Sequence, residues 1–76
     1  MREALVFEAR RDAYGIDDIA DNCMTVGELK EILDDYNDDT IIVMSHDGGY
    51  TYGSIDINYS HEARETDDGE WERCEW

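Results

Sequence analysis

Apolar and polar positions along the chain predict several short strands and one helix. Residues 4–10 alternate, with Leu5, Phe7 and Ala9 on one side, which is typical of a half-buried strand. Residues 41–44 are four consecutive apolar residues. Such a run indicates a strand that is covered on both faces, so we expect it to be central in its sheet.

The segment "TVGELKEILDDY", residues 25–36, carries the strongest local signal in the chain. Thr25 followed three residues later by Glu28 forms the pattern of a capping box, in which each side chain satisfies the other residue's free backbone N–H. Asn37 is well suited to leave the helix in a left-handed conformation. Between these two ends, one face of the helix carries the apolar positions Val26, Leu29, Ile32, Leu33 and Tyr36. The pattern predicts a helix from about residue 26 to residue 36.

Three further segments give weaker patterns. Residues 11–24 contain Ile16 and Ile19, which suit either a short helix after Asp17 or a loop packed by its isoleucines. Residues 54–59 alternate between apolar and polar residues, which predicts a strand with one wet face. The tail "EWERCEW", residues 70–76, also alternates and predicts an edge strand after the turn "TDDG".

These elements predict a small α+β fold. The simplest way to bury the apolar stripes is an antiparallel sheet of three or four strands with the helix at about 26–36 packed on one face. A chain of 76 residues has room for one thin core, so we expect a single domain over residues 1–76.

The segment "SHDGGYTYGS", residues 45–54, has two possible interpretations. A phosphate-binding loop needs glycines that lead into a helix, ideally with a lysine nearby. Here the glycines lead into a strand-like segment without a lysine. Asp47-Gly48 and Gly48-Gly49 favour a tight turn with positive φ, so we predict a β-hairpin.

Neither catalysis nor metal binding is expected from the residue spacing. His46 and His61 show no recognised ligand spacing with each other or with a cysteine. The acidic run at residues 34–39 lacks the ordered loop and closing glutamate of an EF-hand. We therefore expect no catalytic residues, no metal and no cofactor.

The cysteines and the first residues indicate a cytoplasmic protein. Cys23 and Cys74 are too few for a secreted disulfide scaffold, so we expect reduced thiols, with a single disulfide left open as the alternative. The first eight residues lack the apolar run of a signal peptide, and no segment is apolar for long enough to span a bilayer.

Charge narrows the choice of partner. The chain has 21 acidic and 6 basic residues, a net charge of −15. Direct binding to nucleic acid or to an anionic membrane is disfavoured because both would be repelled, whereas a basic protein surface would be attracted. General solubility or a salt-rich habitat is the alternative explanation. The charge is uneven: residues 1–33 hold 8 acids and 4 bases, net −4, and residues 34–76 hold 13 acids and 2 bases, net −11.

The candidate contacts with such a partner are acids on turns and strands, together with tyrosines beside glycines. Exposed tyrosines are common anchors of interfaces, although these could instead close the ends of a thin core. The candidate partner-binding residues are Asp34, Asp35, Asp38, Asp39, Asp47, Tyr50, Tyr52, Asp67, Asp68, Glu70, Glu72 and Glu75.

Residues 24–55 resemble a pattern found in small proteins of bacteriophages and mobile elements, with a capped "TVGEL" helix, an acidic turn, an apolar strand and a "DxGY" hairpin. In size and charge alone, the chain is similar to phage anti-CRISPR proteins that act as DNA mimics. That similarity implies a non-enzymatic inhibitor in the host cytoplasm, and the implied partner is a basic nucleic-acid-binding host protein such as a CRISPR effector nuclease.

Two other function classes remain open. One is a small structural or accessory phage domain that self-assembles or binds a protein through exposed aromatic residues. The other is a protein that sequesters a small ligand with the "HDGGYTYG" hairpin. The sequence leaves the oligomeric state open.

Overall fold

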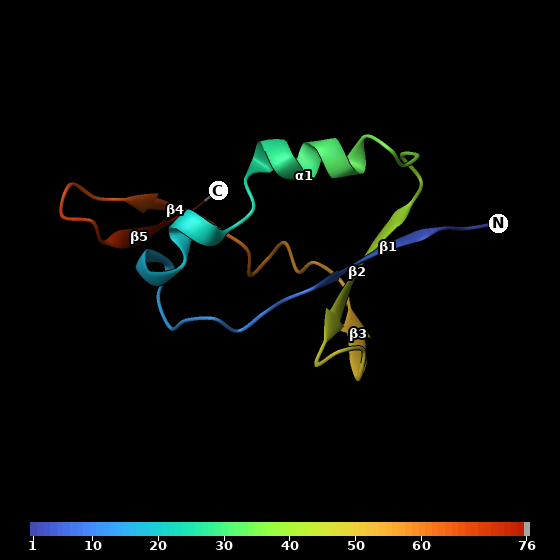
Figure 1. Cartoon of the computed structure of the whole chain (residues 1–76), viewed down its shortest axis with the longest axis horizontal. Helices are drawn as coiled ribbons and strands as arrows, with labels where there is room; N and C mark the ends of the chain where they lie inside the picture. The colour runs from blue at the N-terminus through green and yellow to red at the C-terminus, as the bar shows by residue number, and fades with distance from the viewer. Residues whose placement is uncertain (76) are drawn as a thin grey trace. The chain divides into compact units, whose positions relative to one another are not determined.

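The computed structural model describes residues 1–75, which group into two compact units (Figure 1). Unit 1 is Met1–Arg10 with Cys23–Ile55, and unit 2 is Arg11–Asn22 with Asp56–Trp76. Trp76, the last residue of the predicted edge strand, lies outside the described residues. The expectation of one domain for the whole chain stays a prediction.

Unit 1 is built on a three-stranded sheet in the order β1-β2-β3, with β1 at Ala4–Glu8, β2 at Ile41–His46 and β3 at Thr51–Gly53. The central position expected for the apolar run at 41–44 is confirmed, but the expected cover on both faces is wrong, since Ile41 is 39% and Ile42 is 38% exposed. β2 and β3 are antiparallel, but β1 and β2 are parallel, with Leu5 opposite Ile42. The sheet is therefore mixed, unlike the antiparallel sheet that the pattern predicts. The reason is the helix between the two strands, because a helical crossover returns the chain in the parallel direction.

The α-helix α1 spans Val26–Leu33, and its start is the one the sequence predicts. The Glu28 N–H donates to Thr25 Oγ1 at 3.2 Å, and the Thr25 N–H donates to Glu28 Oε1 at 3.1 Å. The helix ends earlier than predicted, since residues 34–36 continue as tight turns. There the N–H of Asp35 and the N–H of Tyr36 bond carbonyls only three residues back.

Removing the capping hydroxyl should weaken the fold without changing it. We expect Thr25→Ala to lower the free energy of unfolding by about 0.5–2 kcal/mol, because the Glu28 N–H loses its acceptor. Urea denaturation followed by circular dichroism measures the loss. The control is Ser54→Ala, an exposed position outside the helix, where the change should stay within about 0.5 kcal/mol. Equal stability of the Thr25→Ala variant and the parent protein would contradict the prediction.

The helix lies over one face of the sheet, as the sequence predicts (Figure 1). Leu33 and Tyr36, at its C-terminal end, line the same hollow as Leu5 and Ile42. Residues of the opposite face include Val6 and its partner Val43. The α+β class with one main helix is thus confirmed.

Residues 54–59, predicted as a strand, are not one. The strand β3 comes earlier, at Thr51–Gly53, and Asp56 starts a turn instead. The N–H of Asn58 donates to Asp56 Oδ1 at 3.1 Å, and the Ser60 hydroxyl donates to the Asp56 carbonyl at 2.8 Å. The strand prediction is wrong because the side chains of Asp56 and Ser60 bond the nearby backbone, which holds the segment in a turn.

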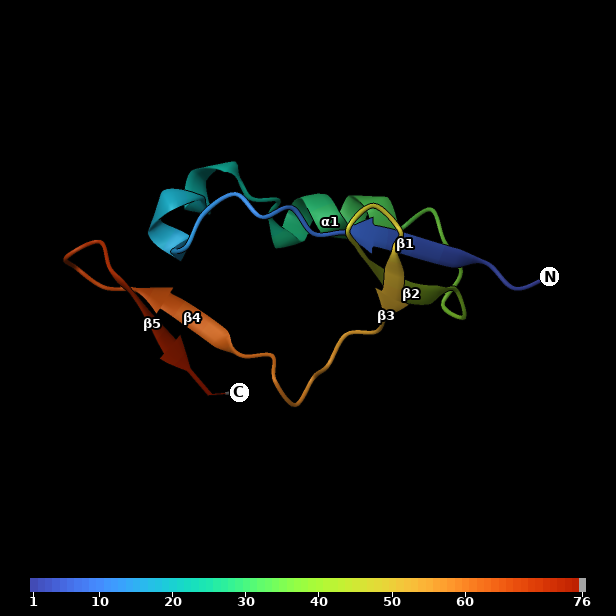
Figure 2. The same ribbon diagram turned by 90° about the horizontal axis from the view of Figure 1, so that it is seen from below.

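Unit 2 contains a separate two-stranded antiparallel sheet, formed by β4 at Glu62–Glu65 and β5 at Trp71–Cys74 (Figure 2). The turn "TDDG" joins them as predicted, with Gly69 at φ 83°. β5 confirms the tail strand, whereas β4 had no counterpart among the predicted strands. The ambiguous residues 11–24 form two short 3-10 turns, η1 at Ile16–Asp18 and η2 at Ala20–Asn22.

Candidate functional site

Four candidate acids lie in the connection from α1 to β2. We call Asp34, Asp35, Asp38 and Asp39 the helix-end acids. All four are exposed, and within residues 1–75 no hydrogen bond or ion pair occupies their carboxylates. The C-terminal end of a helix carries partial negative charge, so carboxylates there are unfavourable for the helix. The stability of α1 therefore does not account for the position of Asp34 and Asp35, the two acids directly after the helix.

A second group of candidates lies at the other end of β2. The turn from β2 to β3 places Asp47, Gly48 and Gly49 at φ values of 52°, 67° and 96°. The N–H groups of Gly49 and Tyr50 both donate to the His46 carbonyl, at 3.2 and 3.0 Å. These bonds and the antiparallel register confirm the hairpin interpretation of "SHDGGYTYGS".

The two tyrosines of this hairpin are available for contact. Tyr50 is 81% exposed and Tyr52 is 64% exposed. Both rings are thus too exposed to close the ends of a core, which was the alternative interpretation, and none of the hydrophobic side chains among residues 1–75 is buried. Tyr52 Oη also lies close to Gly49, where an added Cβ would meet it at 3.0 Å.

A row across the sheet joins Glu8, Ser45 and Tyr52, because Ser45 is opposite Glu8 on β1 and opposite Tyr52 on β3. The Ser45 hydroxyl donates to Glu8 Oε1 at 2.9 Å. Ser45 is 5% exposed and is the one buried side chain among residues 1–75. Sequence reasoning missed this contact, since it depends on the parallel register of β1 and β2.

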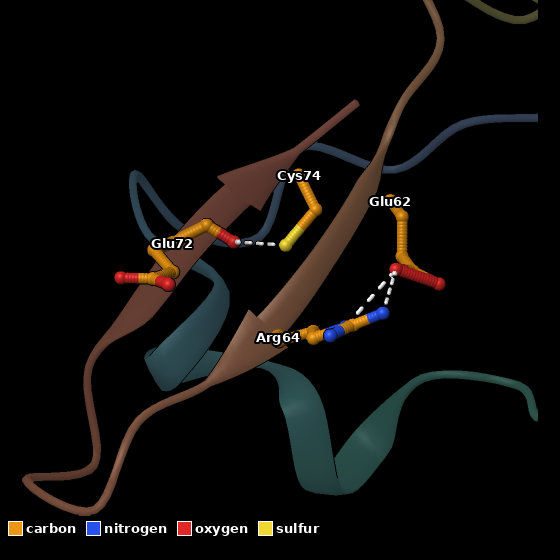
Figure 3. Close-up of polar contacts among 4 residues, drawn as sticks. All are labelled: Glu62, Arg64, Glu72 and Cys74. Atoms are coloured by element: carbon orange, nitrogen blue, oxygen red, sulfur yellow. Dashed lines mark hydrogen bonds and ion pairs between the residues drawn. The ribbon is translucent and has the colours of Figure 1, made fainter. Parts of the chain in front are cut away.

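The remaining candidates belong to unit 2. Asp67 and Asp68 occupy the β4–β5 turn, Glu70 follows that turn, and Glu75 comes directly after β5. Glu72 lies opposite Arg64, and Arg64 also pairs with Glu62 through an Nη2–Oε1 distance of 3.0 Å (Figure 3). The Arg64 guanidinium is thus held by Glu62 of its own strand, and among residues 1–75 Glu72, like the helix-end acids, has no ion pair.

The structure separates the candidates of unit 1 into two groups rather than one. The helix-end acids precede β2, while Asp47 and Tyr50 follow it. The five steps from Ile41 to His46 extend about 17 Å at the usual rise of a strand. A partner that touches both groups must extend along the full length of β2.

The two cysteines and the possible metal ligands form no further site among residues 1–75. Cys23 is exposed and Cys74 is half-buried, and both are free; the Cys74 thiol lies 3.9 Å from the Glu72 carbonyl oxygen (Figure 3). Among residues 1–75, no three histidine, cysteine or acidic side chains gather closely enough to hold a metal ion. In the same part of the chain, none of the helices is both long and apolar enough to cross a bilayer.

Known proteins give no further guide to this site. No protein-family model matches the chain, and neither the curated proteins nor the solved structures contain a significant match. The resemblance to phage and mobile-element proteins therefore stays a prediction.

Proposed function

We propose that this protein is a non-enzymatic inhibitor that binds the basic nucleic-acid-binding surface of a host protein. The observation that carries this proposal is the position of the helix-end acids. All four carboxylates are exposed and unpaired, and Asp34 and Asp35 stand at the helix end, where the dipole disfavours them. A cationic partner would offset both the dipole and their mutual repulsion, so complex formation removes a cost that the free protein bears.

The net charge of −15 supports the same partner chemistry. A protein surface that holds nucleic acid is rich in lysine and arginine, because it must neutralise phosphates. Carboxylates can compete for those cations, and the field of the whole chain speeds the encounter. Nucleic acid and this protein would then exclude each other from one surface.

A CRISPR effector nuclease in the host cytoplasm is the target class we favour. Such enzymes hold a guide–target duplex in a positively charged channel and read a short motif with arginines. The chain is similar in size and charge to phage anti-CRISPR proteins that mimic DNA. The choice of target rests on this analogy, whereas the expected charge contacts rest on the exposed carboxylates.

A second candidate function is supported by the exposed aromatic residues. Tyr14 and Tyr59 are exposed in unit 2, as Tyr50 and Tyr52 are in unit 1. Tyrosine rings on a surface are typical anchors for protein partners. A structural or accessory domain that assembles with itself or with phage proteins would use these rings, and its binding would depend little on salt.

A pull-down from host lysate separates the two candidates. The inhibitor should recover a nucleic-acid-binding protein at low salt, and both added DNA and high salt should release it. A charge-matched acidic peptide of scrambled sequence serves as the control for unspecific attraction. Recovery of the bait alone as a defined oligomer would contradict the inhibitor and support the accessory domain.

A further inference from the structure

An apolar hollow of about 190 Å³ opens at the C-terminal end of α1. Leu5 and Ile42 of the sheet and Leu33 of the helix provide its apolar wall. Tyr36 and Asp38 line the same hollow, and Tyr36 is 40% exposed. An enclosed cavity of about 150 Å³ holds a benzene molecule in another protein, so this hollow has room for one large side chain.

We propose that this hollow receives one arginine side chain of the basic partner. This proposal rests on the function proposed above and assigns one contact between this protein and its basic partner. The methylene stem of the arginine packs on Leu33 and Ile42, and its guanidinium group lies at Asp38 and the Tyr36 ring. Long cationic side chains bury their stems on apolar surface in this way while the charged head stays near water.

Charge complementarity decides which kind of side chain fits. A purely apolar side chain would fill the hollow but would cover the Asp38 carboxylate without giving it a counter-ion. Among cations, arginine fits better than lysine. Its guanidinium group is planar and weakly hydrated, so it can stack on an aromatic ring and bind a carboxylate at once.

The adjacent hollow explains why the charged head is assigned to Asp38. A polar hollow of about 540 Å³ lies beside the first, and Arg2 lines it together with Glu3 and Asp39. Arg2 brings a cation into that hollow, and this cation would repel a second guanidinium group there. Asp38 lines the apolar hollow without such a cation, so it is the carboxylate left for the partner.

Hepta-arginine and hepta-lysine peptides, added to the full chain at low salt, test the proposal. Both have the same charge, so general attraction treats them alike. We expect hepta-arginine to shift the NMR signals of the Leu33 and Ile42 methyl groups and to show nuclear Overhauser contacts from arginine methylenes to them. Hepta-lysine should bind without those contacts. Equal binding of both peptides with unchanged methyl signals would overturn the proposed arginine contact in the hollow. The proposed binding to a basic protein surface would still stand. Binding of neither peptide would overturn both.

Three variants locate the contact. Thr40→Phe fills the hollow without changing charge, and it should remove the preference for hepta-arginine while circular dichroism shows an intact fold. Tyr36→Leu keeps the exposed position apolar but removes the ring, and should weaken hepta-arginine binding by about two- to five-fold. Asp38→Asn should weaken it by a similar factor, about two- to five-fold, whereas its matched control Asp21→Asn, at an exposed acid outside the candidate partner-binding residues, should change it less. An unchanged preference in both hollow variants, Thr40→Phe and Tyr36→Leu, would overturn the proposal.

Discussion

Neutralising all four helix-end acids to asparagine should slow association with the basic partner by at least about ten-fold at low salt. Electrostatic attraction acts on the encounter, so the change should appear in the association rate more than in the dissociation rate. The Debye length is about 30 Å at 0.01 M salt and about 3 Å at 1 M, so the difference should nearly vanish at high salt. Stopped-flow or surface-plasmon measurements with the recovered partner give both rates.

A matched variant in unit 2 is the control for this test. Changing Asp67, Asp68, Glu70 and Glu75 to their amides removes the same amount of charge from a different place. If only the helix-end variant is slow, the contact lies at the end of α1. If both are slow by the same factor, the attraction is spread over both groups of acids and the helix-end acids are not a special contact. Unchanged association of both variants at low salt would contradict charge mimicry altogether.

Gly49→Ala should be among the most destabilising single substitutions in unit 1. Gly49 has φ 96°, which side chains rarely adopt, and its new Cβ would meet Tyr52 Oη at 3.0 Å. The strained backbone alone should cost about 1–3 kcal/mol of folding free energy. Urea denaturation measures the loss, and Tyr52 must also shift, so the hairpin tyrosines should change their NMR signals.

Gly48→Ala provides the comparison within the same turn. Gly48 has φ 67°, near the ordinary left-handed region, and a Cβ there meets no atom within 4 Å. We expect a smaller cost of about 1–2 kcal/mol. A larger loss for Gly48→Ala than for Gly49→Ala would show that the contact with Tyr52 does not shape the hairpin.

Local chemistry made several elements predictable. The Thr25–Glu28 box needs only residues three apart, so it fixed the start of α1 from sequence. Asp47 and the two glycines after it tolerate positive φ, so they fixed the hairpin turn in the same way. In each case the interacting groups are neighbours in the chain, and no distant contact is required.

Elements that depend on distant partners were harder to predict. Residues 54–59 alternate like a strand, yet Asp56 bonds its own neighbours, and residues 62–65 pair with the tail instead. Alternation shows that a segment suits a strand, but it does not say which segment lies beside it. The parallel pairing of β1 and β2, and with it the Ser45–Glu8 bond, was hidden for the same reason.

The sequence by itself determined the net charge of −15 and the cap and turn of two local motifs, since these follow from composition and from contacts over three or four residues. Only the tertiary structure decided which carboxylates lie next to a surface that a partner could contact. The crossover places Asp38, one of the helix-end acids, at an apolar hollow whose walls come from β1, α1 and β2. It also sets Asp47 and the hairpin tyrosines at the far end of β2. Such proximity depends on how strands pair across long stretches of chain, and a linear pattern does not encode that pairing on its own.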